Sequence, residues 1–218
     1  MTDLGPPQAT VRFILASASP ARYDTLLRAG VVPERLVSNF DESSVPDRPP
    51  AELAQAIANS KATVVWQELK RESMILDEPL TETLVLGCDS LFELDGEALG
   101  KPSSYEDSIA RWKKMRGRKG ILHTGHCLID CVAERTVQAT VSTTVHFSDV
   151  TDEEIEVYCS SGEPSNVAGA FTIDGFGGWF IDGVEGDHHN VVGLSLPVLR
   201  TMLKDLNVSL WDLGYPTP

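Results

Sequence analysis

The chain has 218 residues, of which 42% are hydrophobic and 23% are charged; this fits one α/β domain or two closely packed lobes and excludes a disordered chain. Its 18 Lys and Arg stand against 32 Asp and Glu, and a net charge of −14 argues against a nucleic-acid scaffold because such a surface repels phosphates. A small anionic ligand would need a local group of cations, backbone N–H groups or a metal ion.

The two termini and the cysteines bear on the compartment. The N-terminal lead, 1–10, has neither a basic segment nor an apolar core, so it is not expected to be a signal peptide. No apolar run approaches the ~20 residues of a membrane span. The four cysteines form no CxxC pair, and we expect buried free thiols in a reducing cytoplasm at Cys88, Cys127, Cys131 and Cys159.

The first part of the chain predicts alternating strands and helices. A helix is expected after Ser19, which is a good N-cap, with Pro20 at the first helical position and Gly30 as its stop. A continuous apolar run such as 83–88 is typical of a strand covered on both faces. The expected elements are a strand over Val11–Ala16, a helix over Pro20–Ala29, a strand over Arg35–Ser38, a helix over Ala51–Arg71 and a strand over Thr83–Cys88.

The second part predicts long antiparallel strands. Asp95-Gly96 indicates a hairpin turn between 91–94 and 97–99. The further expected elements are helices over Tyr105–Arg116, Thr151–Ser160 and Leu196–Leu206, long strands over Ile121–Val132 and Thr136–Phe147, and short strands over Ala170–Ile173 and Trp179–Ile181. We therefore predict a mixed α/β fold with flanking helices, a single domain over 11–206 and a peripheral tail over 207–218.

The junction between the first strand and first helix is suited to an anion. A helix N-terminus presents unpaired N–H groups and a partial positive charge, and Ser17, Ser19 and Arg22 add hydroxyls and a cation. The segment has no GxxxxGK[ST] pattern and is not a Walker loop. An ordinary capped helix explains the same residues.

Lys61 lies on the face of its helix that otherwise carries apolar residues, at i+4 steps from Leu53, Ile57 and Val65. A buried ammonium needs a partner, and a phosphate would serve. The alternatives are a side chain that reaches the surface or a buried ion pair.

Acidic residues and a second lysine complete the candidates. Asp89 follows an apolar strand, where a carboxylate can take a proton from water or hold Mg²⁺, although turns also favour Asp. Lys101 follows the hairpin, and Asp41-Glu42 sits in a polar loop; each is also explained by solvation. His123, His126 and His146 fall on strands and are expected to be structural, whereas Asp174 lies in a Gly-rich region of turns.

Taken together and in this order, the motifs resemble the Maf family of nucleotide pyrophosphatases. The matching stretches cover about 14 to 205 and are ILASASPARYDTLLRAG, FDES, SKA, GCDSLFELDGEALGKP, TGHCLI, TTVHFSDVTDEEIEVYCSSGEPSNVAGAFTIDGFGGWFIDGVEG and NVVGLSLP. The resemblance implies a two-lobed α/β fold with a central cleft, similar to inosine-triphosphate pyrophosphatases. It implies hydrolysis of non-canonical or pyrimidine nucleoside triphosphates, such as dTTP and UTP, to monophosphate and pyrophosphate.

The resemblance also implies roles by position. Asp89 matches the catalytic proton acceptor, and Asp89 with Glu42 would lie at a divalent cation, Mg²⁺ or Mn²⁺. Ser90 replaces the usual Thr. The phosphate-binding set would be Ser17, Ser19, Arg22, Lys61 and Lys101, while Arg22, Ser90 and Asp174 would bear on specificity. Family members are commonly homodimers, and we expect no nucleic-acid or membrane partner.

Two departures from the family pattern bear on specificity. Ala21 replaces the first of two arginines, so one phosphate contact is lost or replaced. Asp174 stands where pyrimidine-preferring members carry Gln, and an ionised Asp only accepts hydrogen bonds, so an altered base preference is expected. Two alternative functions are a cell-division regulator that acts through partner binding and a 7-methyl-GTP pyrophosphatase. The regulator is disfavoured because it would not need the intact set of Arg22, Lys61, Asp89 and Lys101. The 7-methyl-GTP pyrophosphatase is disfavoured by the presence of Asp89.

Overall fold

The computed structural model describes residues 9–214, so 1–8 of the predicted N-terminal lead and 215–218 of the predicted tail lie outside the described residues. The described chain forms one sheet with the strands β1 (Arg12–Leu15), β2 (Glu34–Arg35), β3 (Thr83–Leu94), β4 (Glu97–Leu99), β5 (Lys119–Asp130), β6 (Arg135–Phe147) and β7 (Ile181–Glu185). Its helices are α1 (Pro20–Arg28), α2 (Pro50–Leu76), α3 (Tyr105–Met115), α4 (Asp152–Ser160), α5 (His188–Val192) and α6 (Leu196–Asp205).

The sheet is mixed, as predicted. Its strand order is β2-β1-β3-β5-β6-β7, with β4 added beside β3. β1 is parallel to β2 and to β3, whereas the β3–β5, β5–β6 and β6–β7 pairs are antiparallel. The fold class is therefore confirmed as α/β with long antiparallel strands and flanking helices.

β3 differs from the prediction in a way that matters for the site. The sequence predicts a strand that ends at Cys88, but β3 continues through Asp89 and Ser90 to Leu94. Its pairing with β5 is unbroken from Leu84 to Glu93. The polar residues Asp89 and Ser90 suggest the end of a strand, but the cross-strand hydrogen bonds to β5 outweigh this local preference. Asp89 thus lies inside a strand and not after one.

One edge of β3 is interrupted beside Asp89. β1 pairs with β3 as far as Leu86, and β4 pairs with β3 from Phe92 onward. Between these two neighbours, residues 87–91 have a strand partner only on the β5 side. We call this stretch the β3 gap. Backbone groups here are free to meet side chains or a ligand, because no strand covers them.

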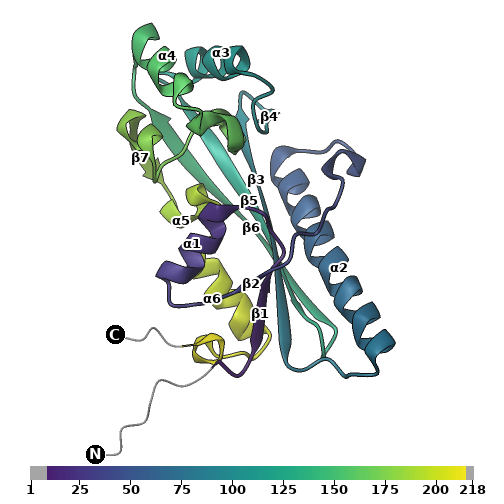
Figure 1. The fold of residues 1–218 in the computed structure, drawn as a ribbon. Helices are drawn as coiled ribbons and strands as arrows, with labels where there is room; N and C mark the ends of the chain where they lie inside the picture. Colours follow the sequence, from purple (N-terminus) through teal and green to yellow (C-terminus); the bar gives the residue numbers. More distant parts are fainter. Residues whose placement is uncertain (1–8, 215–218) are drawn as a thin grey trace, which may run out of the picture.

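The helices cover the two faces of the sheet (Figure 1). α2 packs on one face against Val85, Cys127 and Ile129, and α1 and α6 pack on the other against Leu84 and Leu86. A Cβ atom on Gly87 would overlap the carbonyl oxygen of Ala58 and stand 2.8 Å from the backbone nitrogen of Ala62. Glycine at this position therefore lets α2 lie close against β3.

A second lobe is built on the distal half of β3. Trp112 of α3 and Tyr158 of α4 are fully buried there among aromatic rings, including Phe92, Phe147 and Phe171. In Figure 1 this lobe, with α3 and α4, lies at the end of the sheet opposite α6. The β3 gap falls where the two lobes meet, between the last β1 pair and the first β4 pair.

Several boundaries depart from the prediction. α2 runs from Pro50 to Leu76, longer than predicted, and β2 is only the pair Glu34–Arg35. The predicted strands at 170–173 and 179–181 are wrong: short 3₁₀ turns occupy Ala168–Ala170 and Phe176–Phe180, and β7 begins only at Ile181. The carboxylate of Glu163 accepts bonds from the N–H groups of Phe176 and Gly177, and this fold-back replaces strand pairing.

The hairpin and the capping signals are confirmed. Asp95 and Gly96 form the β3–β4 turn with φ of 56° and 83°. Ser19 caps α1, and Thr151 forms a capping box with Glu154 at α4. In the described part of the tail, Leu213 is buried against the α6 side of the core.

Among the described residues, no helix is both long and apolar enough to span a bilayer. All four cysteines are buried and unpaired, as predicted. Burial raises the pKa of Cys88, Cys127 and Cys131 to about 12, so these thiols are not reactive thiolates at neutral pH.

Candidate active site

Two loops with candidate residues flank the β3 gap: one carries Ser17 and Ser19, and the other carries Lys101. On the β1 side, the chain leaves the sheet after Leu15, passes through Ser17 and Ser19 and enters α1. On the β4 side, the strand runs antiparallel to β3, so the chain beyond Leu99 heads back along the gap with Lys101. Two segments far apart in sequence thus approach the same open edge.

Asp89 lies in the gap on the face of β3 that α2 covers. The residue is only 7% exposed, and its Oδ1 accepts a bond of 2.7 Å from Nζ of Lys61. Burial raises the pKa of the Asp89 carboxyl, and the nearby charges of Lys61 and Arg22 oppose that rise. A carboxylate with a raised pKa is a stronger proton acceptor than an exposed aspartate.

Lys61 connects Asp89 to a second carboxylate. Its Nζ also lies 2.6 Å from Oε1 of Glu42, and the Lys61 side chain is 13% exposed. The prediction that Lys61 faces inward is therefore confirmed, and of the two explanations left open, surface exposure is excluded in favour of a buried ion pair. Glu42 is the accessible member, since its side chain is 53% exposed on a 3₁₀ turn capped by Asp41.

The residues present fit a cation that enters with a phosphate ligand. The carboxylates of Asp89 and Glu42 converge on one ammonium, so a hard cation placed nearby would have two oxygen ligands from the protein. Within residues 9–214, no group of three or more His, Cys, Asp or Glu side chains is arranged to hold a metal. Mg²⁺ commonly binds through one or two carboxylates and substrate phosphates, which matches this donor set.

Arg22 lies on the opposite face of β3 and is 8% exposed. Its guanidinium donates to the carbonyl oxygens of Gly193 and Cys88, at 2.8 and 2.9 Å, and to the hydroxyl oxygens of Ser17 and Ser90, at 3.1 and 2.9 Å. The Cys88 carbonyl belongs to the β3 gap, so the guanidinium supplies the donor that a neighbouring strand would otherwise provide. Arg22 thereby ties the loop over residues 16–19, which we call the anion loop, to β3.

The two serines of the anion loop keep donor capacity. Oγ of Ser17 accepts from the backbone N–H of Ser19 and from Arg22, and Oγ of Ser19 accepts from the backbone N–H of Arg22. In the described part of the chain, neither hydroxyl donates to a protein acceptor. Each can therefore donate to an anion at the N-terminus of α1.

Lys101 and Asp174 stand apart from these clusters. The Gly100 carbonyl before Lys101 accepts bonds from Nη1 of Arg111 and from the N–H of Gly169, which fixes the loop while the Lys101 side chain stays exposed. Asp174 is exposed in the bend that precedes Phe176. Neither side chain makes an ion pair within the described residues.

The histidines are structural, as expected. His123 connects Ser142 and Glu93 across three strands through bonds of 2.8 Å at each ring nitrogen. Nε2 of His126 accepts from the N–H of Ser195, and burial followed by the nearby Arg22 charge lowers the pKa of His126 to about 4. The ring is thus neutral at pH 7.

Sequence reasoning missed two residues that complete the Arg22 side, Thr124 and Asn190. Oγ of Thr124 lies 2.9 Å from Oγ of Ser90 and 3.0 Å from the carbonyl oxygen of Asn190. Both residues stand in stretches that resemble the family pattern, TGHCLI and NVVGLSLP, but neither carries charge, so nothing in the sequence marks them as part of a site.

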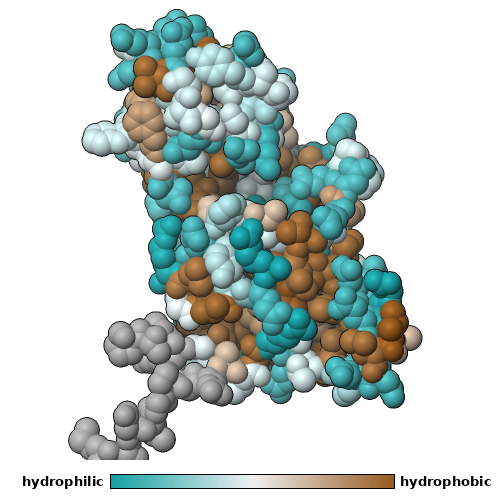
Figure 2. Space-filling view, in the orientation of Figure 1, coloured by the Kyte–Doolittle hydropathy of each residue, from teal (hydrophilic) through white to brown (hydrophobic). Residues whose placement is uncertain are grey.

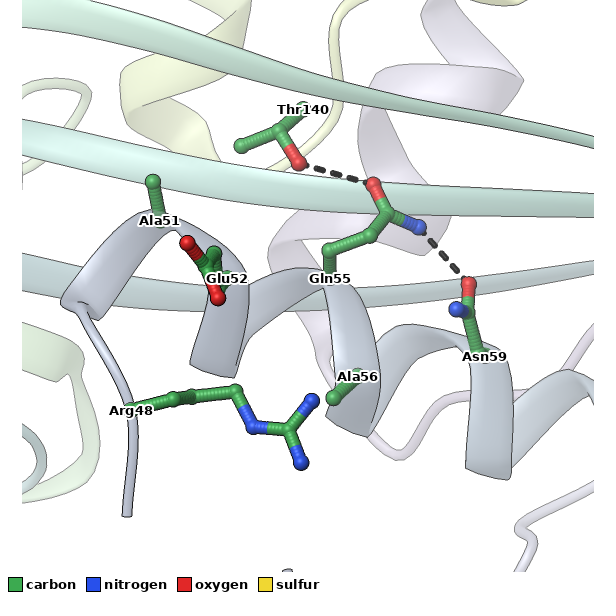
Figure 3. Close-up of a pocket in the computed structure, with 7 residues that line it drawn as sticks. All are labelled: Arg48, Ala51, Glu52, Gln55, Ala56, Asn59 and Thr140. Carbon is green, nitrogen blue, oxygen red and sulfur yellow. Dashed lines mark hydrogen bonds between the residues drawn. The ribbon is translucent and has the colours of Figure 1, made fainter. Parts of the chain in front are cut away.

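Asp89 is not among the residues that line two surface hollows. One, of about 310 Å³, is bounded by Arg48, Glu52 and Asn59, and Figure 3 shows Gln55 in its wall bridging Thr140 and Asn59. The other, of about 500 Å³, is bounded by Glu153, Phe176 and Trp179 on the second lobe. Among the described residues, the β3 gap joins a buried carboxylate to a lysine, and Arg22 at the start of α1 contacts the same gap, so we take it as the candidate site.

Fold and site together define an α/β protein with a buried carboxylate–lysine pair in an interrupted strand edge, which Arg22 of α1 also contacts. The model of the Maf-like protein family matches residues 12–206, and the chain belongs to the Maf family. It is 51% identical to a Streptomyces coelicolor protein over 210 residues, 96% of this chain and 98% of that protein. It is 50% identical to one from Streptomyces avermitilis, over 99% and 98% of the two chains, and 46% identical to one from Gloeothece citriformis, over 93% and 98%. All three are named nucleoside triphosphate pyrophosphatase.

Proposed function

We propose that this protein is a nucleoside triphosphate pyrophosphatase, a nucleotide diphosphatase that splits the anhydride between the α- and β-phosphates. The observation that carries the proposal is the buried Asp89 carboxylate in the β3 gap, held by Lys61 of α2. The shared name of the relatives supports the same reaction.

Asp89 is the proton acceptor in this proposal. Water attacks the α-phosphorus, the bond from that phosphorus to the bridging oxygen breaks, and its electron pair leaves with pyrophosphate. The water proton passes to Asp89, and Oδ2 is the oxygen that takes it because Lys61 already holds Oδ1. The raised pKa of Asp89 favours this transfer.

Cationic and hydroxyl groups hold the triphosphate. Ser17 and Ser19 donate from the anion loop, and Lys61 and Lys101 approach from the α2 and β4 sides. Arg22 adds a fixed charge behind the loop. These groups offset the charge of a triphosphate on a chain whose net charge is −14.

A divalent cation, Mg²⁺ or Mn²⁺, would be held by Glu42 and Asp89 together with phosphate oxygens. When bound it neutralises phosphate charge and polarises the anhydride. Glu42 suits this role because it is exposed while its carboxylate is already directed toward Lys61 and Asp89.

Base preference is proposed to differ from the pyrimidine-preferring members of the family. The basis is Asp174, an exposed acceptor where those members carry Gln, which both donates and accepts. Turnover across dTTP, UTP, CTP, GTP and methylated variants, in the wild type and in Asp174→Gln, tests the idea. Identical dTTP and UTP selectivity in both proteins would reject it.

The compartment and the assembly are part of the same proposal. Four buried free cysteines are suited to a reducing cytoplasm. A homodimer is proposed from the family resemblance alone, and light scattering at micromolar concentration would test it.

The experiment for the function is product analysis with purified full-length protein, Mg²⁺ or Mn²⁺ and each triphosphate. We expect monophosphate and pyrophosphate in equal amounts. Release of orthophosphate and diphosphate instead would contradict the proposed cleavage site, and no turnover of any triphosphate would contradict the function.

A further inference from the structure

Arg22 is the first member of a chain of hydrogen bonds that runs away from the anion loop. Nη2 of Arg22 lies 2.9 Å from Oγ of Ser90, which lies 2.9 Å from Oγ of Thr124. Oγ of Thr124 lies 3.0 Å from the carbonyl oxygen of Asn190. This chain crosses from α1 through β3 and β5 to α5.

The hydrogen positions in this chain follow from chemistry alone. A guanidinium only donates, and a carbonyl oxygen only accepts. Thr124 must therefore give its one hydroxyl hydrogen to Asn190, which obliges Ser90 to donate to Thr124. The oxygen of Ser90 then presents its lone pair to Arg22.

Asn190, at the far end of this chain of hydrogen bonds, is held by several contacts. Nδ2 of Asn190 donates to the carbonyl oxygens of Leu122 and Val141 and to the hydroxyl of Thr143, at 3.1 to 3.2 Å. The same segment reaches Arg22 directly, because the Gly193 carbonyl accepts from Nε at 2.8 Å. Gly193 has a φ of 118°, and a Cβ there would stand 3.2 Å from that Nε, so a larger residue would crowd the guanidinium.

We infer that Thr124 is a positioning residue for Arg22, whose fixed charge stands behind the anion loop, and that it acts through Ser90. Thr124 is 0% exposed, so it cannot touch a substrate. Its hydroxyl sets the direction of the Ser90 hydroxyl, and that direction turns the Ser90 lone pair to the guanidinium. The inference rests on the proposed function, because a triphosphate is what the anion loop supported by Arg22 would hold.

The same chain of hydrogen bonds also defines the role of Ser90. Its hydroxyl hydrogen is committed to Thr124, so none is left to donate to a nucleobase. Ser90 influences the substrate through the position of Arg22. A hydroxyl is required at position 90 for this, and either Ser or Thr supplies one.

The activity test compares Thr124→Val with Thr124→Ser. Valine keeps the shape and removes the hydroxyl, and we expect kcat/KM for the triphosphate to fall on the order of tenfold to a hundredfold, mainly through KM. Serine keeps the hydroxyl and should stay within about threefold of wild type. In Ser90→Ala, adding Thr124→Val should change little more, since both substitutions break the same chain.

Thr143→Val is the matched control. Thr143 is also fully buried and also bonds to Asn190, but it does not touch Ser90 or Arg22. Equal losses in Thr143→Val and Thr124→Val would show that the loss reflects general damage around Asn190 and would overturn the inference. Wild-type kinetics in Thr124→Val would overturn it as well.

A second readout does not depend on catalysis. In ¹⁵N–¹H spectra of arginine side chains, the Nη2 protons of Arg22, one of which Ser90 accepts, should exchange slowly with solvent in wild type and in Thr124→Ser, and faster in Thr124→Val. If wild-type protein fails to release pyrophosphate, the proposed function is wrong, and this exchange measurement still decides whether Thr124 positions Arg22. Unchanged exchange in Thr124→Val would overturn the positioning role whatever the reaction.

Discussion

Asp89 and Ser90 are neighbours in β3, yet they belong to two different environments. Asp89 faces α2 and an ionic cluster whose outer member, Glu42, is half exposed. Ser90 faces α1 and a buried set of hydroxyl and carbonyl groups around Arg22. The pleat of one strand thus separates a side that can exchange protons and ligands from a side that holds the geometry.

The surface between the two lobes carries both polar and apolar residues. In Figure 2 the waist between the two lobes is mixed in hydropathy, with hydrophilic and hydrophobic residues side by side. The ionic cluster needs contact with water and phosphate, whereas Arg22 needs protection from water to remain fixed. If this division is right, substitutions on the α2 side should change chemistry, and those on the other side should change binding geometry.

The largest expected effect is that of Asp89→Asn. Removing the proton acceptor should lower kcat by at least about a thousandfold with a modest change in KM. The unfolding temperature should stay equal or rise, because the substitution removes a buried carboxylate whose desolvation is costly. A collapse of the fold would mean that Asp89 is structural, and retained activity would mean that another group takes the proton.

Lys61→Met should have the next largest effect, a loss of roughly a hundredfold in kcat/KM. Lys61 lowers the pKa of Asp89 in the folded protein, so its removal raises that pKa. Because the base works only when unprotonated, the acid limb of the pH–rate profile should move to higher pH.

Lys70→Met is the control for Lys61→Met. Lys70 lies on the same helix but pairs with the exposed Glu134 at the surface. The pH–rate profile of Lys70→Met should match that of the wild-type protein. A shift of the Lys61→Met profile to lower pH would contradict the assigned contact.

Glu42→Gln should act mainly on the cation. With one of two carboxylates neutral, the Mg²⁺ concentration that gives half-maximal activity should rise about tenfold, while kcat at saturating Mg²⁺ should change less. Glu52→Gln, an exposed acid at the start of α2, is the comparison. Equal Mg²⁺ curves for wild type and Glu42→Gln would remove Glu42 from the metal site.

The clearest effect on stability, as distinct from chemistry, should come from Gly87→Ala. Its methyl group would press on the backbone of α2 at Ala58 and Ala62, and we expect a loss of about 1–3 kcal/mol in the free energy of unfolding. Gly183→Ala in β7 meets open space and should cost less. Equal denaturant midpoints for the two variants would argue against the close packing of α2 on β3.

Charged site residues were predictable because charge on an apolar face or beside an apolar strand is conspicuous. Lys61 was found in this way, and its pairing with Asp89 and Glu42 fits that reasoning. The end of β3 was not predictable, since local polarity at Asp89 and Ser90 competes with pairing to β5, which is 30 or more residues away in sequence. The gap itself depends on where β1 stops and β4 starts.

The Arg22 side was the hardest part to foresee. Ser90, Thr124 and Asn190 are uncharged, and their relation exists only after β3, β5 and α5 come together. The turns after Glu163 were missed for a similar reason, because one carboxylate organises backbone N–H groups more than ten residues away. Hydrogen bonds between distant neutral groups leave no periodic signal in a sequence.

The central claim is that water, activated by Asp89, attacks the α-phosphorus. Hydrolysis of a triphosphate by the wild-type protein in H₂¹⁸O, followed by mass spectrometry of both products, tests it most directly. One ¹⁸O atom in the monophosphate and none in pyrophosphate is the predicted result. Label in pyrophosphate would place the attack on the β-phosphorus and contradict the account.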